Sequence, residues 1–155
     1  MLYILIFLFI IALDQITKIL ITSTFSLGQE KVIIPKILSF TYVRNEGAAF
    51  GLFSGARIFF IVFTIAVLLG AAYYIVKMRP RSPIEKTALA FIAGGAVGNF
   101  IDRAAFGFVR DFIMTTFIDF PVFNVADCFV CIGAALYVLY AFLDSRNESE
   151  ASENE

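Results

Sequence analysis

Polar and charged side chains gather in the second half of a chain that is otherwise strongly hydrophobic. Aspartates stand at Asp102, Asp111 and Asp127, in the segments GGAVGNFIDR, GFVRDFI and FPVFNVAD. The same segments carry amide and basic residues, namely Asn99, Arg103, Arg110 and Asn124. An ionisable group held at membrane depth is costly and is by default a candidate functional site. Two carboxylates near one membrane surface could share a proton and serve as general acid and general base.

The residues that are missing exclude several other chemistries. The chain has no histidine, which rules out a Ser-His or Cys-His nucleophile and an HExxH zinc site. A Ser-Lys pair is formally possible between Lys18 and Ser23, Ser39 or Ser54. However, Asp14 stands four residues before Lys18 and would keep its amine protonated, unsuited to act as a base.

Cys128 and Cys131 form a CxxC motif inside a hydrophobic segment, without a histidine or a second cysteine pair to complete a metal site. We expect both to behave as small buried hydrophobic residues. The carboxylate chemistry needs no metal and no cofactor, so we expect neither.

Composition places these residues in a membrane protein. Hydrophobic residues make up 60% of the 155 residues, and the mean hydropathy is +0.87. Four segments reach the roughly 20 apolar residues that a spanning helix needs, at 2–21, 58–77, 84–102 and 124–143. The first lacks a basic start and a small-x-small cleavage site, so we interpret it as a retained span rather than a signal peptide. With a net charge of −1 and no basic stripe, a nucleic-acid partner is not expected.

The distribution of basic residues predicts the topology. The link 77–86 carries four lysines and arginines, which favours a cytoplasmic location. Four spans then place both termini in the cytoplasm, with a membrane domain over 1–144 and an acidic, disordered tail over 145–155. The first outer loop has strand character around Phe40–Val43 and an apolar segment after Asn45. We therefore expect an α-helical membrane protein with four transmembrane helices, a small extracytoplasmic β-containing loop region and a short interfacial helix.

This topology brings the unusual polar residues to one side of the membrane. They are Asp14, Lys18, Asn45, Asn99, Asp102, Arg103, Asp111, Asn124 and Asp127. Each also has a structural interpretation, since Asp14 and Lys18 could be an i,i+4 ion pair and Asn124 with Asp127 a helix cap. Unrelated structural groups would be scattered over both faces, so their convergence favours a single site.

The polar segments also resemble a known family in order and spacing. DQITK at 14–18, NEGAAFG at 45–51, GGAVGNFIDR at 94–103, VRDFI at 109–113 and FNVAD at 123–127 are similar to the signature segments of lipoprotein signal peptidase. This family, signal peptidase II, consists of bacterial membrane aspartic endopeptidases. The chain differs at Arg110, where the family often has an apolar residue, and in its CxxC motif.

The resemblance implies specific roles for these residues. Asp111 and Asp127 would be the catalytic pair, and Asn45, Asn99, Arg103 and Asn124 would line the substrate site. Asp14 and Lys18 would hold the scaffold, and we group Asp102 with them as a structural polar residue. The implied substrate is a prolipoprotein whose lipobox cysteine carries diacylglycerol, cut on the amino side of that cysteine. Membrane lipids are the other expected partners of what we expect to be a monomer in the bacterial cytoplasmic membrane, with its active site on the extracytoplasmic side.

Two other function classes remain open at this point. A proton- or ion-coupled transporter would also use intramembrane carboxylates, but it needs polar residues along a path across the bilayer. The inner halves of the predicted spans lack ionisable groups except at helix ends. A non-catalytic membrane scaffold is the other alternative, and cleavage of a lipidated precursor would distinguish it from an enzyme.

Overall fold

Four long helices account for most of the chain. The computed structural model describes residues 1–47, 55–80 and 82–153, with side chains described as far as residue 146. The helices are α1 (Leu2–Thr24), α2 (Arg57–Met78), α3 (Pro83–Phe106) and α4 (Val125–Glu153). All four are long and apolar enough to cross a membrane, which confirms the predicted number of spans. Their hydrophobic side chains are largely exposed, as expected when lipid rather than protein covers them.

Helix α3 is the centre of the bundle and packs against α1, α2 and α4. Three of its glycines allow this close approach. A Cβ atom on Gly98 would lie 2.5 Å from Oδ2 of Asp14, and one on Gly94 would lie 3.0 Å from Ile10. One on Gly95 would collide with the backbone oxygen of Ala126 in α4. Small residues at this spacing let helix backbones approach in membranes, so the sequence GGAVG fixes how close α1 and α4 lie to α3.

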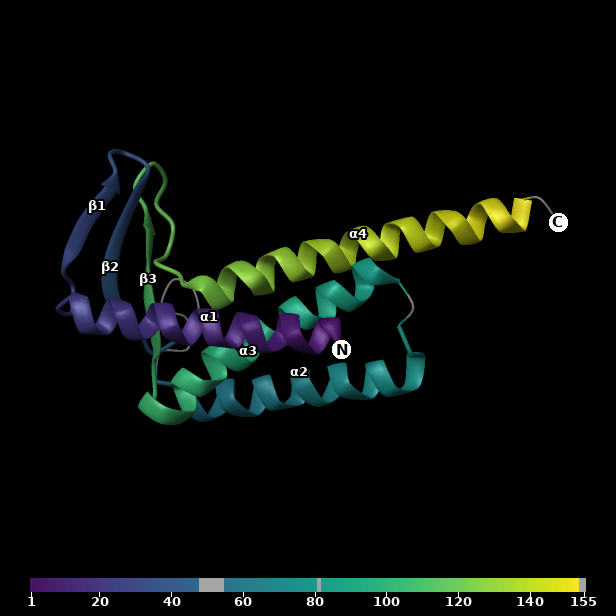
Figure 1. The fold of residues 1–155 in the computed structure, drawn as a ribbon, viewed down its shortest axis with the longest axis horizontal. Coiled ribbons are helices and arrows are strands. Elements are labelled where there is room, and N and C mark those ends of the chain that lie inside the picture. Colours follow the sequence, from purple (N-terminus) through teal and green to yellow (C-terminus); the bar gives the residue numbers. More distant parts are fainter. Residues whose placement is uncertain (48–54, 81, 154–155) are drawn as a thin grey trace.

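A three-stranded antiparallel sheet covers one end of the bundle (Figure 1). Its strands are β1 (Glu30–Ile34), β2 (Leu38–Asn45) and β3 (Val109–Thr115), in the order β1-β2-β3. Gly107, with φ of 88°, ends α3 in the left-handed conformation and turns the chain into β3. The sheet packs on α1 through a small hydrophobic core of Ile21, Tyr42 and Phe112.

Two features differ from the sequence prediction, and a third predicted feature falls on residues that are not described. The connection between the third and fourth spans, expected to be a loop, contains β3, and Asp111 lies within this strand. Helix α4 continues beyond the predicted end of its span at residue 143, into the segment expected to be disordered. The expected interfacial helix falls on residues 48–54, which are outside the described part of the chain, and it remains a prediction.

Candidate active site

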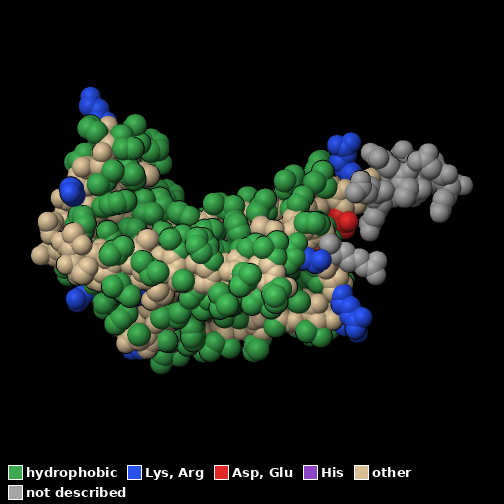
Figure 2. Space-filling view, viewed as in Figure 1, with side chains coloured by type: hydrophobic (Ala, Val, Ile, Leu, Met, Phe, Trp, Pro, Cys, Tyr) green, Lys and Arg blue, Asp and Glu red, His purple; other side chains and the backbone are tan. Residues whose placement is uncertain are grey.

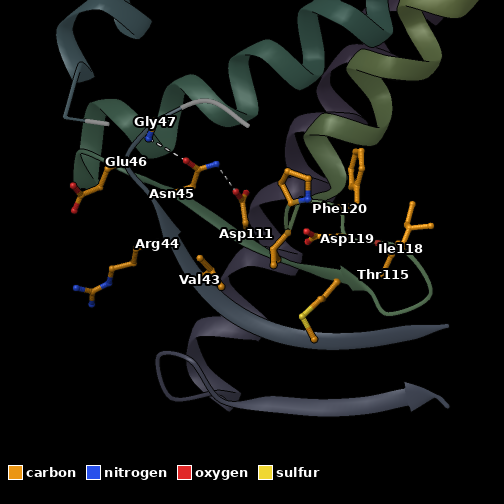
Figure 3. Close-up of a pocket in the computed structure, with 13 residues that line it drawn as sticks. Val43, Arg44, Asn45, Glu46, Gly47, Asp111, Thr115, Ile118, Asp119 and Phe120 are labelled. Atoms are coloured by element: carbon orange, nitrogen blue, oxygen red, sulfur yellow. Dashed lines mark hydrogen bonds between the residues drawn. The ribbon is translucent and has the colours of Figure 1, made fainter. Parts of the chain in front are cut away.

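Asp111 is the best-buried carboxylate of the sheet. Its exposed fraction is 2%, and it is held by two amide donors, one at the end of β2 and one just before α4. Nδ2 of Asn45, the last residue of β2, donates to Oδ2 of Asp111 at 2.8 Å, and Nδ2 of Asn124 donates to Oδ1 at 2.6 Å. Figure 3 shows Asn45 between Asp111 and the backbone of Gly47, whose N–H it also binds at 3.0 Å. Asp111 is therefore fixed by neutral donors on both of its oxygens.

Asp127 lies in the first turn of α4 and is held by the start of that helix. The backbone N–H of Asn124 donates to Oδ2 of Asp127 at 3.0 Å, and the N–H of Asp127 donates back to Oδ1 of Asn124 at 3.1 Å. This reciprocal pair is a capping box, so the structural interpretation of the two residues is correct. The helix cap does not account for all contacts of Asp127, because Nδ2 of Asn99 also donates to its Oδ1 at 2.7 Å.

The two asparagines connect the carboxylates to each other. Nδ2 of Asn124 donates to Oδ1 of Asn99 at 3.0 Å as well as to Asp111. Asn99 therefore contacts Asp127 and Asn124, while Asn124 contacts both Asp111 and Asp127. Residues from β3, α3 and α4 form one continuous hydrogen-bonded group. A movement of either carboxylate would disturb the donors of the other.

The surroundings of Asp111 favour its protonated form. Burial, followed by the negative charge of Asp127, raises the pKa of Asp111 from 3.8 to about 7. The hydrogen bonds donated by Asn45 and Asn124 act in the opposite direction, because they stabilise the charged carboxylate. At neutral pH Asp111 can therefore either hold or release a proton, which general acid and base catalysis requires.

Both carboxylates open onto the same cavity. Asp111 and Asp127 line a space of about 580 Å³, together with Phe123 and Ile132, which give one wall an apolar surface. Asp111 also lines a neighbouring space of about 600 Å³, whose wall includes the charged residue Arg44 (Figure 3). The site can thus contact apolar and polar parts of one ligand at the same time.

Arg103 closes this cavity from the side of α3. Its Nη2 donates to the backbone oxygen of Gly47 at 3.0 Å, and its guanidinium stacks on the ring of Phe60 at 4.6 Å. It lines the same cavity as Asp111 and Asp127 and contributes a positive charge to it. Arg103 thereby ties the chain that follows β2 to α2 and α3.

A family model described as signal peptidase (SPase) II matches residues 6–143. The chain belongs to the signal peptidase II family. A lipoprotein signal peptidase of Bacillus velezensis is 44% identical over 97% of this chain and 99% of its own length. One of Brevibacillus brevis is 45% identical over 88% of this chain and 92% of its own length. The family model thus covers all the polar segments, from residue 14 to residue 127.

A solved structure supports the same assignment. A bacterial membrane enzyme determined by the in meso method at 2.3 Å resolution superposes with a TM-score of 0.89 and 39% identity. The match covers 94% of this chain and 90% of the solved one. This signal peptidase II is accordingly an enzyme, and its four apolar helices make it a multi-pass protein of the bacterial cytoplasmic, or inner, membrane.

Beneath the site of this signal peptidase II lies a buried group of two acids and two bases. Nζ of Lys18 lies 2.9 Å from Oδ2 of Asp14 and 3.6 Å from Oδ2 of Asp102. It also donates to Oδ1 of Asn99 at 2.9 Å, which links the group to the site above. Asp14 accepts the backbone N–H of Ala126 at 3.0 Å and so holds the start of α4. The predicted pairing of Asp14 and Lys18 is confirmed.

Sequence reasoning missed the part that Arg110 plays in this group. Nη2 of Arg110 donates to Oδ1 of Asp102 at 2.6 Å, while Nε and the backbone N–H donate to Oδ2 at 3.0 and 2.9 Å. Gln15 completes the contact, since its Oε1 accepts Nη2 of Arg110 at 2.9 Å. Adjacent strand residues point to opposite faces, so Arg110 anchors β3 from behind while Asp111 faces the cavity. A basic residue between Val109 and Asp111 was the available signal.

The prediction for the cysteines is wrong in part. Cys128 is half-buried, but Cys131 is exposed on the surface of α4, and both line the cavity that holds Asp111 and Asp127. Both thiols are free. Among the described residues, no group of three or more acidic, cysteine or histidine side chains is arranged to hold a metal ion.

Proposed function

We propose that this signal peptidase II removes the signal peptide from diacylglyceryl-modified prolipoproteins, cutting on the amino side of the modified cysteine. Asp111 and Asp127 are the proposed catalytic pair. The observation that carries the proposal is that both carboxylates line one cavity while burial and mutual charge keep Asp111 ready to hold a proton. The names of the relatives, lipoprotein signal peptidase, support the substrate class.

The proposed reaction is hydrolysis by an activated water. Asp127, as the charged carboxylate, takes a proton from water while the water oxygen bonds to the scissile carbonyl carbon. Asp111 donates its proton to the carbonyl oxygen, which gives a neutral tetrahedral diol. Asp127 then passes its proton to the leaving nitrogen as the C–N bond breaks, and Asp111 recovers a proton from a diol hydroxyl. The enzyme returns to its starting state, and no metal or cofactor takes part.

The amide residues have a positioning role in this proposal. Asn45 and Asn124 fix the two oxygens of Asp111, and Asn99 fixes Asp127. Arg103 lines the cavity and presents its guanidinium to a substrate carbonyl or to the ester groups of the modified cysteine. The apolar wall around Ile132 provides surface for the lipid or the signal helix.

The proposed setting is an extracytoplasmic active site in a monomer whose two termini lie in the cytoplasm. The lipid-modified cysteine of a prolipoprotein lies at the outer membrane surface, so a site at the sheet end of the bundle meets it there. Prolipoproteins and the surrounding membrane lipids are the proposed partners. Approach of the signal helix beside α4 would leave the scissile bond next to Asp111 and Asp127.

A transporter is less compatible with the arrangement of polar residues. Glu85 is the buried acid at the opposite end of α3, where it accepts the hydroxyl of Tyr74 at 2.6 Å. It stands 14 residues before Asn99, which is about 21 Å along a helix. The buried residues of α3 between them are alanines and glycines, namely Ala88, Ala90, Gly94, Gly95 and Gly98. They offer no side chain that could pass a proton from one end to the other.

The test is cleavage of a diacylglyceryl-modified precursor by purified enzyme. Asp111→Asn and Asp127→Asn should each lower the rate by at least about a hundredfold, the lower range for loss of a positioned acid or base. The matched control is Asp144→Asn, which removes an exposed carboxyl in the half of α4 away from the site and should keep full activity. Substantial turnover by either of the first two variants would rule out the proposed mechanism.

A further inference from the structure

A second large groove lies at the end of the bundle away from the active site. It has a volume of about 570 Å³ and is lined by α1, α2 and α3 near the amino end of α1 and the carboxyl end of α2. These helix ends lie opposite the sheet (Figure 1). None of the residues that line this groove lines the cavity of Asp111 and Asp127. The groove is therefore separate from the proposed peptidase site.

The groove exists because two helices stand apart on a shared floor. Helices α1 and α2 both pack on α3, but within the described chain they make little contact with each other. The floor is made of small side chains of α3, Ala90 and Ala93, spaced so that they share one helix face. Larger apolar residues form the walls, such as Phe7 of α1 and Leu68 and Ile75 of α2. The result is an apolar groove, and the small side chains of Ala90 and Ala93 leave the space between its walls open.

Two basic side chains line one end of this groove. Arg79 is the residue that ends α2, with φ of 50°, and Lys86 lies in the first turns of α3. Nζ of Lys86 lies 5.7 Å from the ring of Tyr3, which places the amine over the groove's aromatic edge. The described residues that line the groove include no acid. Glu85, the neighbouring acid, accepts the hydroxyl of Tyr74 at 2.6 Å, and among the described residues it forms no ion pair with Arg79 or Lys86.

We propose that this groove binds one anionic phospholipid, with its phosphate between Arg79 and Lys86 and an acyl chain along the alanine floor. The two parts of the groove match the two parts of such a molecule, since basic side chains near a membrane surface attract anionic lipids and apolar walls exclude water. A zwitterionic lipid would gain less from the two cations. A signal peptide fits poorly, because its amino-terminal region carries positive charge and would be repelled by Arg79 and Lys86.

The absence of tryptophan in the chain allows a direct test. A Phe7→Trp variant places the chain's single tryptophan in the wall of the groove, where selective excitation of its indole avoids the tyrosines and acyl-brominated lipids quench it on contact. In vesicles of phosphatidylcholine, an added brominated phosphatidylglycerol should compete for the groove about fivefold better than brominated phosphatidylcholine. This preference is the order expected when the anionic lipid gains the contribution of one basic residue over the zwitterionic lipid. Equal quenching by the two brominated lipids would overturn the proposal.

The contribution of Arg79 and Lys86 is tested in the same Phe7→Trp protein. Arg79→Gln with Lys86→Gln should reduce the preference for phosphatidylglycerol to near one. Lys77→Gln is the matched control, because Lys77 is a basic residue in the last turn of α2 that does not line the groove. It should keep the preference. A preference that survives the double substitution would show a general surface effect and contradict a defined site.

A second measurement does not depend on the tryptophan. Intact protein transferred from detergent into a mass spectrometer should retain one phosphatidylglycerol but not phosphatidylcholine, and the Arg79→Gln, Lys86→Gln protein should retain neither. Cleavage of the lipidated precursor serves as the folding check, since none of these residues lies near Asp111 or Asp127. Equal retention of the two lipids by the unmodified protein would contradict the proposal.

Discussion

The carboxylates of the proposed site are held by asparagines rather than by cations. The side-chain donors to Asp111 and Asp127 come from Asn45, Asn99 and Asn124. The amine of Lys18 binds Oδ1 of Asn99 and contacts neither carboxylate directly. A lysine or arginine in direct contact would lower the pKa of an aspartate and fix its charge. Neutral amides position the oxygens and still allow a proton to move, which suits residues that alternate between acid and base.

The raised pKa of Asp111 has a consequence for stability. A carboxyl whose pKa rises from 3.8 to about 7 on folding binds more protons in the folded state, so it favours folding below about pH 4. This contribution is lost as pH rises through 7. Asp111→Asn, which mimics the protonated form, should therefore be more stable than the native protein at pH 8, by about 2–4 kcal/mol. The difference should shrink at pH 5.

Thermal unfolding in detergent at the two pH values measures this effect. Asp144→Asn provides the comparison for removal of an exposed carboxyl. A difference between Asp111→Asn and native protein that is the same at pH 5 and pH 8 would show that Asp111 is not protonated preferentially in the fold.

At the scale of elements, Gly95 is one of the glycines that allow α3 and α4 to pack closely. A methyl group on Gly95 would collide with the backbone oxygen of Ala126 and lie 2.7 Å from Val130, whereas nothing lies within 4 Å of a Cβ on Gly70 of α2. Gly95→Ala should lower stability by about 1–3 kcal/mol through overpacking. Gly70→Ala should leave it unchanged or raise it by up to about 1 kcal/mol, because alanine favours a helix. The melting temperatures of the two variants measure these changes in stability. Equal changes for Gly95→Ala and Gly70→Ala would contradict the packing argument.

The buried ion group joins α1, α3 and β3 and should behave as one unit. Lys18→Met leaves Asp14 without a cation partner among the described residues, because Arg110 pairs with Asp102. Breaking a buried pair from one side costs about 3–5 kcal/mol in soluble proteins, and we expect a loss of this order. Asp14→Asn added to Lys18→Met removes the excess negative charge and should recover part of it. Thermal stability and expression level measure the loss in the single variant and the recovery in the double variant. A single variant that is fully stable but inactive would instead move Lys18 into the catalytic machinery.

The sequence predicts some of these contacts and not others, for a physical reason. Long apolar runs reveal the spans, and helical periodicity reveals that Asp14 and Lys18 share a face. Asp102 and Arg110 are on different elements, joined through the turn at Gly107, and no periodicity crosses such a turn. Strand β1 and the burial of Glu85 were missed for the same reason, since both depend on which elements pack together.

At the scale of the whole molecule, charged side chains mark two ends and apolar ones cover the length between them (Figure 2). The sheet end holds the proposed catalytic cavity, and the other end holds the lipid groove with the amino end of α1 and the carboxyl end of α2. An even number of spans brings both chain ends to that second end. The position of one end relative to the membrane therefore determines the position of every site.

The last prediction tests this orientation in intact cells. In a background with Cys128→Ala and Cys131→Ala, a cysteine introduced at Lys31 of β1 should react with a membrane-impermeant maleimide added from outside. One introduced at Lys77, in the last turn of α2, should react only after the membrane is permeabilised. Both positions are exposed lysines, one at each end of the bundle, so they form a matched pair. The reverse labelling pattern would place Asp111 and Asp127 in the cytoplasmic leaflet, away from a lipid-modified cysteine at the outer surface, and would exclude the proposed substrate geometry.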